Sequence, residues 1–162
     1  MNQERENFSK HGKSFQEGLC QLMLIDRPFA DQIFEVFDVD FLELKYLRIF
    51  VELIKNYRDK YNVHPTEKIM LSVVRTELGA HPEAIKIRIR DYFAHTISTK
   101  LEVEGAKYIK DISLDFCRKQ KLKEALIKSV DLIKRSSFDE VSDVINNAIK
   151  LGSDNDFGYD YH

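Results

Sequence analysis

Residues 101–135 read LEVEGAKYIKDISLDFCRKQKLKEALIKSVDLIKR and contain no proline and only one glycine, Gly105. Apolar residues recur through this segment at the spacing of one face of an α-helix. They are Ile109, Ile112, Phe116, Leu122, Leu126, Val130 and Ile133. The segment therefore predicts one long helix. The spacing lapses over residues 117–121, which indicates that the two halves of the helix pack on different surfaces.

A second helix is predicted directly after the first. Ser136 and Ser137 interrupt the first helix, and Ser137 forms an S-x-x-E capping box with Glu140. This helix runs through Leu151, with Gly152 just beyond its end. Its apolar stripe consists of Phe138, Val141, Val144, Ile145, Ala148 and Ile149. The two segments predict a long helical hairpin, whose second stripe is half bare unless it meets the first helix or another chain.

Five shorter helices are predicted before residue 100, because several capping signals separate apolar stripes of helical spacing. Asp26 precedes Pro28 as an N-cap, Asn62 marks the end of the third helix, Thr66 opens the fourth, and Gly79 suits a left-handed C-cap. The buried stripes of the first four helices are Phe15, Leu19, Leu22 and Met23; Phe29, Ile33, Val36 and Phe37; Leu44, Leu47, Phe50, Val51, Ile54, Tyr57 and Tyr61; and Ile69, Met70, Val73, Val74 and Leu78.

The fifth segment, which follows His81-Pro82, is ambiguous. Ile85, Ile87 and Ile89 alternate at the period of a strand, whereas Ile85, Ile89 and Tyr92 also fit a helix. The surrounding helices favour a helix. The predicted fold is thus all-α, with a small orthogonal helical bundle at residues 1–100 and a helical hairpin at 101–151.

The composition agrees with this class. Hydrophobic residues make up 43% and charged residues 32% of the 162, which is typical of a soluble chain that folds. With only 6 glycines and 3 prolines, an all-β fold is disfavoured. No apolar run approaches the roughly 18 residues that span a bilayer, and the charged start lacks the apolar stretch of a signal peptide. We therefore expect a cytoplasmic protein without a membrane segment.

The two cysteines, Cys20 and Cys117, lie in apolar helical segments without the spacing of a metal or redox motif. Buried free thiols are the favoured interpretation, because a thiol behaves as a small hydrophobic group. A bridge between the two is the alternative.

The net charge of -2 hides a segregation of charge. Residues 102–135 carry nine basic and six acidic side chains, whereas residues 136–162 carry six carboxylates and one basic residue, Lys150. Antiparallel helices of opposite charge explain this pattern, and a basic strip for a partner or nucleic acid is the second explanation.

No pattern of catalytic or metal-binding residues appears. Gly12-Lys13-Ser14 resembles the end of a phosphate-binding P-loop, but Asn7 stands where the earlier glycine is required. The five histidines form no HxxxH or HExxH pair. Asp154, Asp156 and Asp160 lack the glutamate that closes a calcium loop. We expect no enzyme, no metal and no cofactor in this chain.

The order of these features resembles the amino-terminal domain of phage DnaB-type replicative helicases, over nearly the whole chain. The residues that carry the resemblance are Phe15–Leu24, Pro28–Phe37, Phe41, Phe50–Ile54, Lys55, Tyr57, Tyr61, Val63, Pro65, Tyr108, Ile109, Arg118, the hairpin, and Phe157–Tyr161. Tyr159 stands where those proteins tend to have histidine, and their motor domain with its P-loop has no counterpart here.

The resemblance implies the collar of a hexameric ring that unwinds DNA during replication. In that family, hairpins of neighbouring subunits pack together as a trimer of dimers, and the collar docks a DnaG-type primase or a helicase loader. ATP and Mg²⁺ would be bound by the motor domain, and residues 152–162 would be the start of the linker to it. The negative net charge of the chain predicts that this piece binds DNA weakly if at all.

The candidate dimer contacts lie on the apolar face of the hairpin, where packing within one hairpin needs the same spacing. They are Phe116, Leu122, Leu126, Val130, Phe138, Val141, Ile145 and Ala148. Arg118, Lys119, Lys121 and Lys123 are candidates for a surface that faces a partner or DNA, or are simply solvated. A free-standing helical adaptor and a nucleic-acid-binding protein are the alternative functions.

Overall fold

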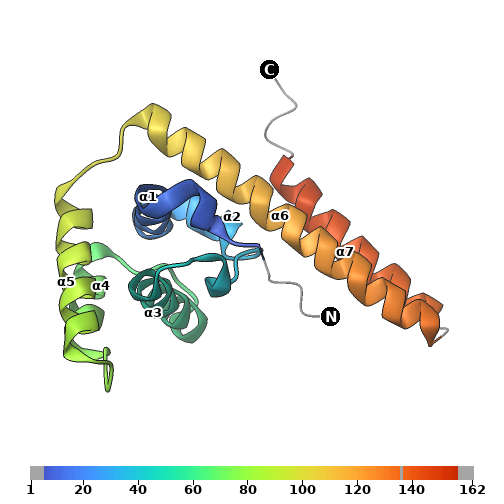
Figure 1. Ribbon diagram of the computed structural model, residues 1–162, viewed down its shortest axis with the longest axis horizontal. Helices are drawn as coiled ribbons and strands as arrows, with labels where there is room; N and C mark the ends of the chain where they lie inside the picture. The colour runs from blue at the N-terminus through green and yellow to red at the C-terminus, as the bar shows by residue number, and fades with distance from the viewer. Residues whose placement is uncertain (1–5, 136, 157–162) are drawn as a thin grey trace. The chain divides into compact units, whose positions relative to one another are not determined.

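The computed structural model describes residues 6–135 and 137–156, which form α-helices and short 3₁₀ helices and no β-strand (Figure 1). The predicted all-α class is confirmed. None of the described helices is long and apolar enough to cross a lipid bilayer. The chain divides into two compact units, Met1–Asp111 and Ile112–His162.

The first unit is a helical bundle. Its elements are η1 (Phe8–His11), α1 (Gly12–Ile25), α2 (Arg27–Ile33), η2 (Val39–Phe41), α3 (Lys45–Tyr61), α4 (Glu67–Thr76) and α5 (Glu83–Ser98), followed by the first turns of α6 (Val103–Lys134).

Asp26, Thr66 and Asn62 cap their helices as predicted, whereas Gly79 lies beyond the end of α4, whose C-cap residue is Glu77. The Asp26 carboxylate accepts the Phe29 amide at 3.1 Å, and the Thr66 hydroxyl accepts the Ile69 amide at 3.2 Å, so α2 and α4 begin with side-chain caps. Asn62 ends α3 in the left-handed region with φ 56°, and Gly79 follows α4 with φ 55°.

The second helix is shorter than its apolar pattern predicts. Val36 and Phe37 were expected on this helix, but α2 ends at Ile33. The Val36 amide donates to the Ile33 carbonyl in a tight turn, and Val36 is fully buried from that turn. Apolar spacing cannot separate a buried helical residue from one buried just after a helix end.

The ambiguous fifth segment is a helix, as the surrounding helices predicted. Ile89 is fully buried on α5 while Ile87 is exposed, so the isoleucines do not share one face as they would on a strand. The side-chain amide of Gln21 donates to the carbonyls of Thr96 and Thr99 at 3.2 and 2.6 Å. This buried amide satisfies backbone acceptors at the carboxyl end of α5.

An aromatic cluster lies in the core of the bundle. Phe50 on α3 is fully buried and packs edge-on against Tyr92 on α5, with ring centroids 5.1 Å apart. The Phe93 ring, also on α5, has its centroid 6.4 Å from that of Phe50. The Tyr92 hydroxyl donates to the Glu17 carbonyl, which ties α5 to α1 through a polar group that is itself satisfied.

The first turns of α6 pack on α1. Tyr108 meets Phe15 edge-on at 6.3 Å, and the Lys110 ammonium lies 3.0 Å from the Asp26 carboxylate. A Cβ at Gly18 would come within 2.7 Å of the Ile109 Cδ1, so this position suits glycine. The sequence places the change from bundle to hairpin at residue 100, whereas the compact units divide between Asp111 and Ile112 because these contacts join the start of α6 to the bundle.

The second unit is the rest of α6 with α7 (Phe138–Asp156), and Figure 1 shows the two helices antiparallel and side by side. The Ser137 carbonyl accepts the Val141 amide, which makes Ser137 the N-cap residue of α7. The expected end at Leu151 is wrong, because α7 continues to Asp156. Gly152 has no positive φ and remains within the helix, which glycine tolerates at a modest cost.

Both cysteines are buried free thiols, as predicted. Burial raises the pKa of the Cys20 thiol well above its usual value, and the nearby Glu17 carboxylate adds to the rise. The thiol at this position is therefore a packing group rather than a reactive one.

Candidate interaction surface of the hairpin

The hairpin has an inner seam of small and apolar side chains. On α6, Ala125, Ser129 and Leu132 are buried at intervals of three and four residues. The Ser129 hydroxyl donates to the Ala125 carbonyl at 2.7 Å and is thereby satisfied. On α7 the half-buried residues repeat at the same spacing, and they are Val141, Val144, Ile145, Ala148 and Leu151. We infer that these two stripes form the seam of the hairpin.

A second apolar stripe on α6 faces outward. Leu122 is 44% exposed, Leu126 53% and Val130 52%, and Ile133 completes the stripe at 52%. Leu122 and Ile133 are eleven residues apart, about three turns, so all four lie along one face of α6. A contiguous apolar stripe of this kind on a polar chain marks an interaction surface.

The outer stripe of α7 is shorter. Phe138 is 67% exposed and Ile149 is 54% exposed. These residues are also eleven apart and thus share one face of α7. The hairpin therefore keeps exposed apolar side chains on both helices in addition to those of its inner seam.

An open pocket of about 270 Å³ lies on this surface between the two helices. Leu122 and Ile149, which belong to the two outer stripes, both line it, so the stripes of α6 and α7 belong to one face of the hairpin. The remaining lining residues are Asp115, Arg118, Lys119, Ala148 and Gly152. The pocket has an apolar floor and a charged rim, as expected of a site that receives one apolar side chain.

The residues proposed from the sequence fall into two groups. Leu122, Leu126, Val130 and Phe138 are exposed on the outer face. Phe116, Val141, Ile145 and Ala148 are half-buried, and of these Ala148 lines the pocket. Ile133 and Ile149 were not among the proposed contacts, although their eleven-residue spacing from Leu122 and Phe138 places them on the same face.

The proposed basic residues are less uniform. The Lys119 ammonium lies 2.8 Å from the Asp115 carboxylate, four residues earlier on α6. The Lys121 ammonium lies 3.8 Å from the Glu124 carboxylate, three residues later on the same helix. Arg118 is half-buried at the pocket and Lys123 is exposed. Because acidic neighbours compensate Lys119 and Lys121, the four residues do not form a continuous basic strip.

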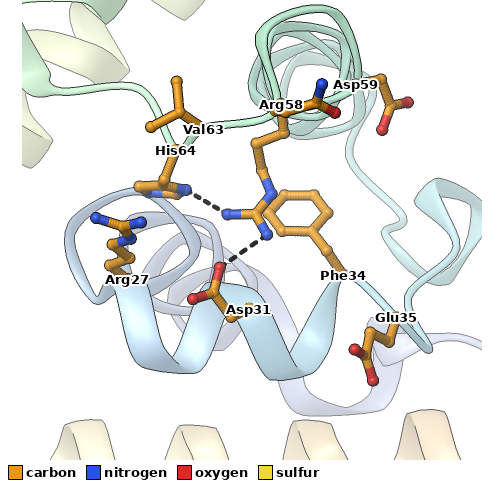
Figure 2. A pocket seen from close by; sticks show the side chains of 9 residues that line it. Arg27, Asp31, Phe34, Glu35, Arg58, Asp59, Val63 and His64 are labelled. Carbon is orange, nitrogen blue, oxygen red and sulfur yellow. Dashed lines mark hydrogen bonds and ion pairs between the residues drawn. The ribbon is translucent and has the colours of Figure 1, made fainter.

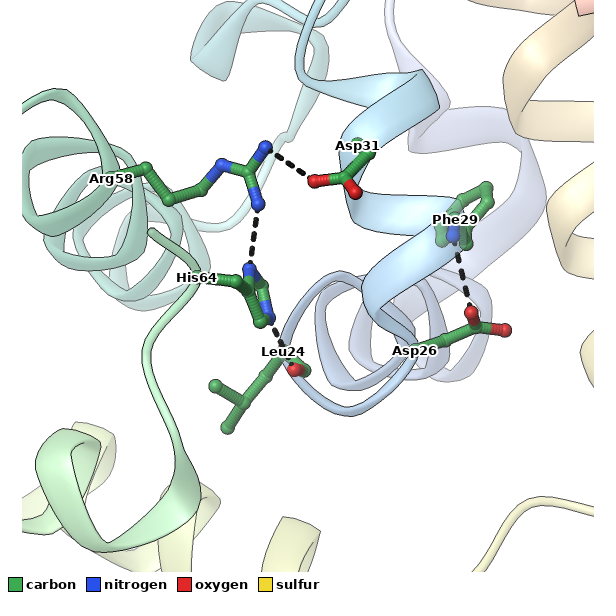
Figure 3. A network of polar contacts seen from close by, with 6 residues as sticks. All are labelled: Leu24, Asp26, Phe29, Asp31, Arg58 and His64. Atoms are coloured by element: carbon green, nitrogen blue, oxygen red, sulfur yellow. Dashed lines mark hydrogen bonds and ion pairs between the residues drawn. The ribbon is translucent and has the colours of Figure 1, made fainter. Parts of the chain in front are cut away.

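The bundle contains a second feature, a polar cleft of about 440 Å³ (Figure 2). Arg58 on α3 lies at its centre, with its guanidinium stacked 4.9 Å from the centroid of Phe34. It donates to the Asp31 carboxylate at 2.9 Å and lies 2.8 Å from the His64 Nδ1. The His64 Nε2 lies 2.6 Å from the Leu24 carbonyl, so one network joins α1, α2 and α3 (Figure 3).

These partners fix the protonation state of His64. Arg58 can only donate, so Nδ1 is an acceptor, and the Leu24 carbonyl can only accept, so Nε2 carries the proton. Burial lowers the pKa of His64 below its usual value, and the charges of Arg58 and Arg27 lower it further against the opposing effects of the Leu24 carbonyl and Asp31. The neutral ring is thus the form that the folded bundle stabilises.

The pH dependence of stability tests this network. Because the pKa of His64 is lower in the folded chain than in the unfolded chain, the unfolded chain binds the proton more readily. The contribution of His64 to the free energy of unfolding is therefore fully present above its usual pKa of 6.5. It is lost as the pH falls through the pKa of the folded state. We expect His64→Ala to lower the free energy of unfolding by about 1–3 kcal/mol at pH 7.5, because Arg58 and the Leu24 carbonyl lose a partner.

The difference between wild type and His64→Ala should shrink as pH is lowered toward 5 in urea denaturation series. The exposed His95 on α5 provides the matched control, since His95→Ala removes an imidazole that is not part of the network. A constant difference across this pH range would show that the neutral His64 is not what the network requires.

The described residues include no group of three or more His, Cys, Asp or Glu side chains arranged to hold a metal ion. Asp160 and the segment Phe157–Tyr161 lie outside the described residues. Comparison of the chain with family models, curated proteins and solved structures found no match.

Proposed function

We propose that this chain is a non-catalytic assembly module whose α6–α7 hairpin joins copies of the chain. One observation carries the proposal: Leu122, Leu126, Val130 and Ile133 form an exposed apolar stripe on α6 that lies apart from the buried residues Ala125, Ser129 and Leu132 of the hairpin seam. Fully burying an exposed apolar side chain of this size contributes about 1.5–3 kcal/mol, and these four, which are already about half buried, would each contribute about half of that. Two copies that cover each other's stripes would bury eight such side chains.

The resemblance to DnaB-type helicases supplies the context of the proposal. In that context the chain is the collar of a hexameric replicative helicase in the bacterial host cytoplasm, and its second task is to dock a DnaG-type primase or a helicase loader. ATP and Mg²⁺ would act in a motor domain outside these 162 residues. The charged rim of the hairpin pocket, with Arg118 and Lys119, is the proposed surface for such a partner.

Molar mass as a function of concentration tests self-association. In size exclusion coupled to light scattering, we expect the mass to rise from 19.0 kDa at low concentration towards twice that value or a higher even multiple. Apolar association should weaken little between 0.1 and 1 M salt, unlike association through charges. A chain that stays at 19.0 kDa at every concentration would instead favour a free-standing adaptor.

A further inference from the structure

The outer face of the hairpin has a recess and a projection. The recess is the pocket of about 270 Å³ whose apolar floor includes Leu122, Ala148 and Ile149. The projection is Phe138, in the first turn of α7, which is more exposed than Leu122, Leu126, Val130 or Ile133 of the α6 stripe. Phe138 and Ile149 lie on the same face of α7, so recess and projection open toward the same side.

The distances along the helices relate these two features to the exposed stripe. In an antiparallel pairing, the stripes of two copies cover each other when Leu126 of one copy faces Val130 of the other. The two-fold axis then passes midway between these two residues, at the level of residue 128. Leu122 lies six residues from this level, about 9 Å towards the start of α6. Ile149 is at nearly the same level as Leu122, because α6 ends at Lys134 and α7 begins at Phe138, so eleven residues along α7 return to about the level of residue 123.

Phe138 lies on the opposite side of the axis. It is eleven residues from Ile149, about 16.5 Å along α7, and therefore about 7.5 Å beyond the axis toward the end of the hairpin. Rotation about the axis brings Phe138 of one copy to about 7.5 Å on the pocket side of the other. There it lies beside Leu122 and Ile149 at about 9 Å, which form the end of the pocket nearest to the axis. The mismatch is about one residue, so the pairing that buries the stripe also brings Phe138 to the pocket.

The charges at the edge of α7 agree with this pairing. Asp139 follows Phe138, and Lys150, the one basic residue in 136–162, follows Ile149. Each charged residue is turned about 100° from its apolar neighbour, so both lie along the same edge of α7. The two-fold axis of this pairing is perpendicular to the helices, so this edge of α7 lies on the same side of the dimer in both copies. Asp139 of each copy therefore lies beside Lys150 of the other, and the pair occurs twice.

We propose that the outer face takes a second copy of the same chain in an antiparallel arrangement, in which Phe138 of each copy occupies the pocket formed by Leu122, Ala148 and Ile149 of the other. Asp139 and Lys150 pair across the interface and fix the alignment of the two hairpins. This proposal rests on the self-association proposed above and defines its contacts. The interaction is isologous, so each contact occurs twice in the dimer.

Phe138→Ala tests the seating of the ring. An aromatic anchor in a pocket is the type of residue that dominates an interface, and each dimer loses two such anchors. In sedimentation velocity over a concentration series of the full chain, we expect the dimer dissociation constant to rise at least about 100-fold. The matched control is Ile127→Ala, because Ile127 is 56% exposed on α6 but lies about 100° around the helix from Leu126. Its dissociation constant should stay within about twofold of wild type.

A charge exchange tests the alignment. Asp139→Lys alone and Lys150→Asp alone each place two pairs of like charges in the dimer, which should weaken it about three- to tenfold at low salt. An equimolar mixture of the two variants restores both pairs in the heterodimer, which should form with nearly wild-type affinity. This recovery should fade at 1 M salt, because the charges lie at an exposed edge.

The outcomes separate the two proposals. A wild-type chain that is monomeric at every concentration overturns both the self-association and this alignment. A wild-type dimer that Phe138→Ala leaves intact, or two charge variants that fail to recover on mixing, overturns the alignment while self-association stands. Far-UV circular dichroism of each variant should match wild type, and Phe138 and Asp139 are exposed, so loss of folding does not explain a loss of dimer.

Discussion

Phe50→Ala is expected to lower the free energy of unfolding of the bundle by about 3–5 kcal/mol, the usual cost of truncating a buried phenylalanine to alanine. Phe50 is completely buried, and its ring contacts Tyr92 and Phe93 of α5 from its position on α3. Truncation loses these aromatic contacts and leaves a cavity between two helices. The loss approaches the whole stability of a small domain.

Urea denaturation followed by far-UV circular dichroism measures this loss. Near-UV circular dichroism adds a local signal. The Tyr46 and Tyr92 rings lie edge-on with centroids 6.0 Å apart, and Tyr92 contacts Phe50. Phe50→Leu serves as the control that keeps most of the buried apolar volume, and it should cost less than half as much. Equal losses for the two variants would mean that the aromatic contacts and the cavity do not determine the stability at this position.

Much of the fold follows from local patterns in the sequence. The helix caps at Asp26 and Thr66 and the left-handed residue Asn62 depend on contacts within four residues, which a sequence pattern contains. The long α6 follows from the absence of proline and from apolar residues at helical spacing on both sides of the lapse at residues 117–121. These elements can be predicted without the tertiary structure.

The structure deviates from the prediction where tertiary contacts determine the local conformation. Val36 is buried from a turn, although its spacing suits a longer α2, and Gly152 stays helical, although glycine often ends a helix. The Arg58–His64 network was not predicted, because its members come together only when the Asn62 turn brings His64 back to Leu24, 40 positions earlier. Nothing in the local sequence of His64 encodes this contact.

The hairpin surface was predicted only in part for a related reason. Helical spacing identifies apolar stripes, but an inner seam and an outer face require the same spacing. Exposure distinguishes them: Ala125 is buried, whereas its neighbour Leu126 is half exposed. The pocket combines residues of α6 and α7, so its position depends on how the two helices align, which neither helix determines alone.

Leu126→Glu with Val130→Glu is expected to abolish self-association, with a dissociation constant raised at least about 1000-fold. In the antiparallel pairing these residues face each other at the two-fold axis, so four carboxylates would meet in a space that excludes water. Both side chains are about half exposed in the single chain, so the monomer should fold with little loss of stability. Light scattering after size exclusion measures the change.

The control for this variant is a glutamate at an equally exposed position off the face. Ile127→Glu adds a carboxylate to the same turn of α6, and its exposed fraction of 56% is close to the 53% of Leu126. If association falls equally in both proteins, added negative charge rather than burial of the stripe explains the effect. If only the double variant is monomeric, the stripe is the surface through which copies meet, and partner binding can then be measured on a folded monomer. A primase or loader that still binds this monomer would use a surface separate from the stripe. A partner whose binding is lost together with the dimer would require the assembled hairpins.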